Sequence, residues 1–191
     1  TNLTKFVIEQ IGTKTPDQYD IITSGRKPRD CMKIRGYHVE KHFSGYSDKP
    51  GYEHARALIQ EVIPRFLNGE VDEVIMVYTH FVNSMTQVAE AHQLLPIETP
   101  QAEQDGQDYI FMPDVTTVCE QILPKYLEIT MYNGLLQSAA SELGARMTAM
   151  TSATDNAGEL IDKVGLEYNK LRQSSITNEI SEIVGGAEAL K

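Results

Sequence analysis

Long apolar runs are missing from this sequence of 191 residues. No stretch approaches the roughly 18 consecutive apolar residues that a membrane-spanning helix needs, and no secretory signal opens the chain. The composition, 41% hydrophobic and 23% charged, is typical of a soluble protein with one cored domain, or with a small domain plus an extended element. The first residue is Thr1 rather than a methionine, so we expect a truncated or processed chain.

Cysteine and positive charge are both scarce. The formal net charge is -10, whereas proteins that bind nucleic acids usually carry a basic face, so we expect no nucleic-acid partner. The two cysteines, Cys31 and Cys119, lie far apart and match no metal-binding spacing. We therefore expect a reduced, intracellular setting in which both thiols are packing residues.

Motifs of catalysis and nucleotide binding are also missing. The sequence contains neither G-x-x-x-x-G-K-[ST] nor G-x-G-x-x-G, and no serine lies in a glycine elbow. We therefore expect no catalytic residue, no metal and no cofactor. The segment SGRKPRD, residues 24–30, places a glycine turn and three cations at a helix start, which suits an anion, but a solvated basic turn is the simpler interpretation. His38 and His42 have a metal-ligand spacing only on a helix, and their surroundings alternate like a strand.

The first part of the chain, residues 1–113, alternates between helical and β-rich patterns. This order predicts an α/β domain with a Rossmann-like, parallel-type sheet. The run at 72–81 is almost continuously apolar, which is typical of a strand covered on both faces. The helix expected at 52–70 should turn five residues inward: Ala57, Leu58, Val62, Phe66 and Leu67. Helices are predicted at 2–12, 27–37 and 52–70, and strands at 19–25, 38–43, 72–81, 83–97 and 108–113.

The second part, residues 114–191, has one uninterrupted helical pattern. Asp114 or Thr116 suits the N-cap, and Pro124 is its only proline. Apolar residues then recur every roughly 3.5 positions from Val118 to Leu171, which is the coiled-coil period. At about 1.5 Å per residue such a helix extends on the order of 110 Å, more than a domain of this size can bury. We therefore expect a very long C-terminal helix of coiled-coil type.

Small residues are frequent along this apolar seam, with glycines at 134, 144 and 158. Glycine costs about 1 kcal/mol relative to alanine in an isolated helix, so we expect a partner helix to cover the seam. Without such a partner, the chain should self-associate through this helix, or leave it partly unfolded or folded back. The seam breaks near Arg172 and Gln173 and resumes out of phase at Ile176.

The C-terminal segment, residues 140–190, resembles the end of the gamma subunit of the F-type ATP synthase. The resemblance is carried by ARM-AM--AT-NA-ELI and by YN--RQ--IT-EI-EIV-GA-AL. Upstream, GRK-RD, F-G-SDKP, GEVDEV--VY--F and QLLPI resemble the globular domain of the same family. The family begins with a long helix and a strand with a glycine-rich turn, and both are expected upstream of Thr1.

This resemblance implies a non-catalytic rotor subunit of the central stalk, which couples transmembrane ion flow to ATP synthesis or hydrolysis. The implied partners are the alpha, beta, epsilon and c-ring subunits, with membrane attachment only through the complex. The complex would lie at the cytoplasmic face of a bacterial plasma membrane, or at the inner face of an energy-transducing organelle membrane. Residues matching the beta-subunit contact are Arg172, Gln173 and Thr177, and contact with epsilon and the c-ring is implied around Tyr126 and Glu128.

Two other functions remain open on the residues alone. One is an α/β domain that binds a phosphate at residues 24–30. The other is a coiled-coil adaptor that has no relation to the synthase, since a heptad seam by itself names no partner.

Overall fold

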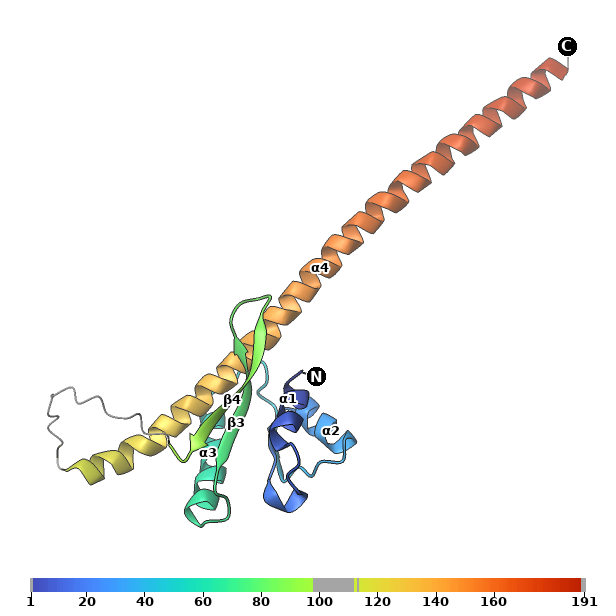
Figure 1. The fold of residues 1–191 in the computed structure, drawn as a ribbon. Coiled ribbons are helices and arrows are strands. Elements are labelled where there is room, and N and C mark those ends of the chain that lie inside the picture. The colour runs from blue at the N-terminus through green and yellow to red at the C-terminus, as the bar shows by residue number, and fades with distance from the viewer. Residues whose placement is uncertain (1, 98–111, 113, 190–191) are drawn as a thin grey trace. The chain divides into compact units, whose positions relative to one another are not determined.

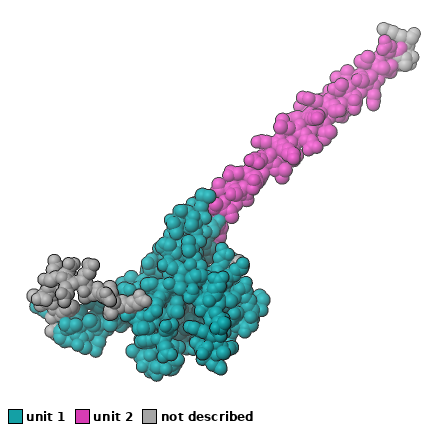
Figure 2. Space-filling model, viewed as in Figure 1, with its two compact units in different colours: residues 1–145 teal, residues 146–191 magenta. Residues whose placement is uncertain are grey.

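The computed structural model describes residues 2–97, 112 and 114–189. The chain divides into two compact units, residues 1–145 and 146–191, and the boundary falls inside the long C-terminal helix (Figure 2). The expected fold class, α/β with a very long C-terminal helix, is confirmed. The division at residues 113 and 114 stays a prediction.

The order of elements follows the sequence patterns closely (Figure 1). The strand expected at 108–113 and the polar loop before it lie outside the described residues, apart from residue 112. The elements are α1 (Asn2–Ile11), the 3-10 helix η1 (Pro16–Gln18), β1 (Ile22–Ser24), α2 (Arg26–Ile34), β2 (Lys41–Phe43), α3 (Tyr52–Leu67), β3 (Val74–Phe81), β4 (Gln87–Leu95) and α4 (Val115–Ala189).

The strands β1 and β2 form a parallel pair, as the alternating pattern predicts. The helix α2 supplies the crossover that a parallel connection requires. Gly25 stands between β1 and α2 with a φ of 102°, a left-handed conformation that favours glycine. Its N–H donates to the Phe43 carbonyl at 2.8 Å, which ties the start of α2 to the end of β2.

The strands β3 and β4 pair antiparallel, so the expected parallel arrangement is wrong for this half of the fold. The turn at residues 82–86 is too short for a crossover, and it closes a hairpin instead. In this turn the Asn83 Oδ1 accepts hydrogen bonds from the N–H groups of Met85 and Thr86, at 2.9 and 2.8 Å. The strand β3 is mostly half-buried and Ile75 is exposed, so coverage on both faces is also wrong.

The core of the first unit lies where α3, β4 and α4 meet. Ile59, Leu94 and Leu127 are buried there, one from each element. The inward face of α3 is carried by Ala55, Leu58 and Ile59, which follow the helical period. The expected inward positions Ala57 and Leu67 are exposed, because the helical period places them on the far side of α3 from this face. Partly buried residues complete the cluster: Ile63, Val74, Met76, Leu95, Ile97 and Met131.

The helix α4 begins at the N-cap that the sequence indicates. The Thr117 N–H donates to Asp114 Oδ1 at 2.9 Å, and the Thr117 hydroxyl donates to Asp114 Oδ2 at 2.7 Å. These bonds satisfy a backbone donor that a helix start leaves free. They also hold the pKa of Asp114 below its usual range, because both favour the charged carboxylate.

Within the second unit, α4 is almost entirely exposed. Every residue from 149 to 188 is exposed except the half-buried Gly165. An apolar seam in water is unfavourable, so this part of α4 needs cover from another chain segment or another protein. Among the described helices, none is long and apolar enough to cross a membrane.

Candidate partner-binding surfaces

The first surface lies where α3 approaches the beginning of α4. The Tyr52 hydroxyl donates a hydrogen bond to Glu128 Oε2, and Arg56 Nε lies 3.7 Å from Glu128 Oε1. The bond to Glu128 raises the pKa of Tyr52, and desolvation acts in the same direction. The Glu128 side chain is only 14% exposed. Its carboxylate is therefore held by α3, and Arg56 and Tyr52 present the more accessible groups.

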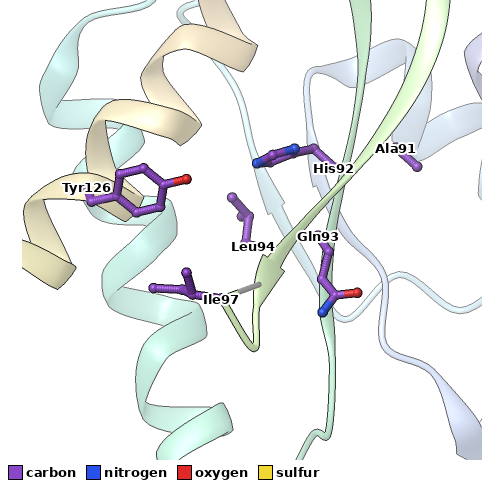
Figure 3. Close-up of a pocket in the computed structure, with 6 residues that line it drawn as sticks. All are labelled: Ala91, His92, Gln93, Leu94, Ile97 and Tyr126. Atoms are coloured by element: carbon purple, nitrogen blue, oxygen red, sulfur yellow. The ribbon is translucent and has the colours of Figure 1, made fainter. Parts of the chain in front are cut away.

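Tyr126 belongs to a different face of α4. It lines an open pocket of about 410 Å³ with residues at the end of β4, and its hydroxyl points toward the His92 ring (Figure 3). Leu94 and Ile97 lie between the ring and the strand (Figure 3). Residues two positions apart on a helix do not face each other. The structure therefore places Tyr126 and Glu128 on separate surfaces.

The sequence gives no signal that two aromatic residues of this region meet. Tyr52 and Tyr132 meet edge to face, with ring centroids 6.1 Å apart, and they join α3 to α4 beside Glu128. Tyr52 is exposed, and interfaces between proteins are enriched in tyrosine and arginine. The long separation between α3 and α4 in the sequence hides the cluster, because no spacing rule connects residues 52 and 132.

The second surface surrounds the break in the seam of α4. The Thr177 hydroxyl donates to the Gln173 carbonyl at 2.8 Å, and the Ser181 hydroxyl donates to the Thr177 carbonyl at 2.9 Å. Each of these hydroxyls therefore bonds the carbonyl four residues earlier in its own helix. Within the described part of the chain, the side chains of Arg172 and Gln173 make no hydrogen bond or ion pair. Their polar groups are therefore available to a partner.

The two weaker sequence features have ordinary local contacts. Gly25 opens α2 as expected, but one of the three nearby cations, Arg29, is paired with Asp30 at 2.8 Å. His38 Nε2 lies 3.3 Å from Glu40 Oε2, whereas His42 Nδ1 lies 3.3 Å from the Thr23 hydroxyl. The two histidines thus have different partners, and the described residues contain no group of three potential metal ligands.

The two cysteines differ in their surroundings. Cys31 is half-buried on α2, as a packing thiol would be. Cys119 is exposed in the first turns of α4, so the expectation that both thiols pack is wrong for this residue. It lies ahead of Leu127, the first buried residue of α4.

An α/β unit continues into a 75-residue helix whose side chains are mostly uncovered, and this helix needs cover from another chain segment or another protein. The family model described as ATP synthase matches residues 1–190. The ATP synthase gamma chain of Moorella thermoacetica is 46% identical over 171 residues, which are 90% of this chain and 61% of that protein. The gamma chain of Macrococcus caseolyticus is 40% identical over 195 residues, with 100% and 68% of the two chains covered.

The chain therefore belongs to the ATP synthase gamma chain family. It spans 61% of the length of the Moorella relative and 68% of that of Macrococcus. Among solved structures, a chain of the Euglena gracilis mitochondrial ATP synthase, OSCP/F1/c-ring, has a TM-score of 0.63 at 19% identity. That match covers 97% of this chain and 66% of the other, and at this identity it shows that the two share a fold.

Proposed function

We propose that the chain acts in the rotor, the central stalk, of an F-type ATP synthase, where it couples transmembrane ion flow to ATP synthesis or hydrolysis. Residues 114–191 form the shaft, and residues 1–113 form the globular domain. The observation that carries the proposal is the family match over residues 1–190, which includes nearly all of α4. The exposed seam of α4 supports it, because a shaft must offer its side chains to surrounding subunits.

The chain contributes no catalytic group in this proposal. Its partners are the alpha and beta subunits around the shaft and the epsilon and c-ring subunits near the globular domain. Arg172, Gln173 and Thr177 meet a beta subunit, and the surfaces around Tyr126 and Glu128 meet epsilon or the c-ring. The chain is held at the membrane only through the complex, which lies on the cytoplasmic face in a bacterium.

A chimeric gamma chain tests the proposal. The part of the Moorella thermoacetica gamma chain that matches this sequence is replaced by this chain, and the chimera is produced with the other synthase subunits of that organism. Membrane vesicles containing the chimera should show ATP-driven ion pumping, proton or sodium, that vesicles without any gamma chain lack. A chimera that assembles into the complex and leaves pumping at the level of the gamma-free vesicles would contradict the proposal.

The chain alone should bind no nucleotide. The expectation follows from the missing phosphate-loop patterns, since neither glycine-rich motif is present to surround a phosphate group. Isothermal titration calorimetry with ATP and magnesium provides the measurement, and only the heat of dilution should appear. Saturable binding in the micromolar range would overturn the non-catalytic role and would favour a phosphate site at residues 24–30.

A further inference from the structure

The outer edge of β3 is bound by side chains of α4. The Thr79 N–H donates to the Ser138 hydroxyl at 3.3 Å, and the Phe81 N–H donates to Gln137 Oε1 at 3.0 Å. The Ser141 hydroxyl donates to the Thr79 carbonyl at 3.1 Å, and Ser141 is buried. Backbone groups at an unpaired strand edge require partners. Here three side chains within about one turn of α4 supply them.

Two glycines let α4 approach the hairpin on either side of these bonds. A Cβ atom at Gly134 would lie 2.6 Å from Met76 Sδ, and one at Gly144 would lie 2.9 Å from Phe81 Cε2. At about 1.5 Å per residue, the glycines are about 15 Å apart along the helix axis. The hairpin lies along this stretch of α4 (Figure 1). Close contact is therefore maintained over several turns, not at a single point.

This arrangement opposes turning of α4 about its own axis. One residue corresponds to about 100° of rotation, so a shift of one position would carry Ser141 away from the Thr79 carbonyl and leave a partly buried acceptor without its donor. The same rotation would bring a residue with a Cβ atom against Met76 and Phe81, and those side chains would then have to shift. The contact thus combines attractive hydrogen bonds with steric repulsion, and both favour a single rotational orientation of α4 about its axis.

We propose that the hairpin β3–β4 locks α4 against axial rotation through Gly134, Gln137, Ser138, Ser141 and Gly144, so that torque passes between the α/β domain and the shaft at this contact. The inference rests on the rotor function proposed above. It assigns a mechanical role to residues that touch no nucleotide. Gly144 lies two residues before the boundary between the units, and every residue from 149 to 188 except Gly165 is exposed.

The first test measures the lock in this chain by amide hydrogen exchange. The Thr79 and Phe81 amides should be protected. Gln137→Ala should increase exchange at Phe81 about tenfold, and Ser138→Ala should do the same at Thr79, because each amide loses its one acceptor. Unchanged exchange at both amides would overturn the lock. Gly158→Ala is the matched control, because a Cβ at Gly158 has no neighbour within 4 Å.

The second test measures coupling in the chimeric synthase, as ions pumped per ATP hydrolysed. Gly144→Val and the milder pair Gln137→Ala with Ser138→Ala should lower this ratio several-fold, while ATP hydrolysis continues. The control Ser152→Ala, on the face of α4 opposite the seam residue Ile161, should leave the ratio unchanged. The milder pair keeps the test valid if Gly144→Val fails to fold. A variant could increase exchange at the Thr79 and Phe81 amides and still pump as many ions per ATP as the control. The contact would then be merely structural, and the lock would be overturned. An assembled, unmodified chimera that does not pump would instead overturn the proposed rotor function.

Discussion

Arg172→Ala in the chimeric gamma chain is expected to lower ATP-driven ion pumping strongly, with the fold of the chain unchanged. Arg172 is exposed on α4, and its guanidinium has no hydrogen bond or ion pair with any described residue. Removing it therefore costs the isolated chain little. If it bonds a charged group of a beta subunit, its loss costs about 1.5–3 kcal/mol, which is roughly 10- to 150-fold in the strength of that contact.

Two measurements separate a contact role from a structural one. Pumping by vesicles reports the contact, and thermal melting of the chain by circular dichroism reports the fold. Lys170→Ala is the matched control, because it removes a neighbouring exposed cation whose position, two residues away, faces a different direction. A melting temperature lowered as far as that of the core variant Ile59→Ala would mean that Arg172 is structural. Equal pumping by the Arg172 and Lys170 variants would also contradict the prediction.

The helices and strands of the first unit could be predicted because each shows its own period in the sequence. The direction of β4 could not, since alternation along a strand is the same in a parallel and an antiparallel pair. The deciding feature was the length of the connection. Only the residues 82–86 separate β3 from β4, and a connection this short forces a hairpin. The sequence contained that information, and the overall alternation of helix and strand obscured it.

The glycines of α4 show a different limit. Their spacing indicated a close approach by another helix, and the structure places a β-hairpin against Gly134 and Gly144. A periodic seam identifies the residues that need cover, and it does not say which element covers them. At Gly158 no atom approaches within 4 Å. The expectation of a partner helix therefore stays a prediction for the second unit only.

The candidate contact residues came from the resemblance, and their local geometry could not have been predicted from it. Tyr126 faces the pocket at the end of β4, whereas Glu128 is held by Tyr52 of α3 and lies near Arg56. The surroundings of both side chains depend on contacts between segments about 30 to 75 positions apart in the sequence, and no local sequence pattern predicts such contacts. Arg172 and Gln173 are simpler, because exposure on a helix follows directly from a break in its apolar period.

The chain by itself is expected to self-associate through α4. Six large seam residues are between 41 and 71% exposed, namely Ile122, Ile129, Leu136, Leu143, Met147 and Ile161. Fully burying such a side chain contributes about 1.5–3 kcal/mol, so pairing of two copies recovers part of this free energy at each position. An antiparallel pair with twofold symmetry would bury the same seam on both chains, and its small residues allow a close approach.

Dilution should therefore lower both the helical content of the chain and the average mass of the particles in solution. A long helix interrupted by Gly158 and Gly165 has little stability of its own, so dissociated chains should leave part of the second unit unfolded or folded back. Sedimentation velocity across a range of concentrations gives the mass, and far-UV circular dichroism on the same samples gives the helical content. Ile161→Glu should weaken association, whereas Ser152→Glu places the same charge on the opposite face and should not. A chain that stays monomeric at high concentration with a fully helical second unit would contradict this expectation, because its seam would then be stable in water without any cover.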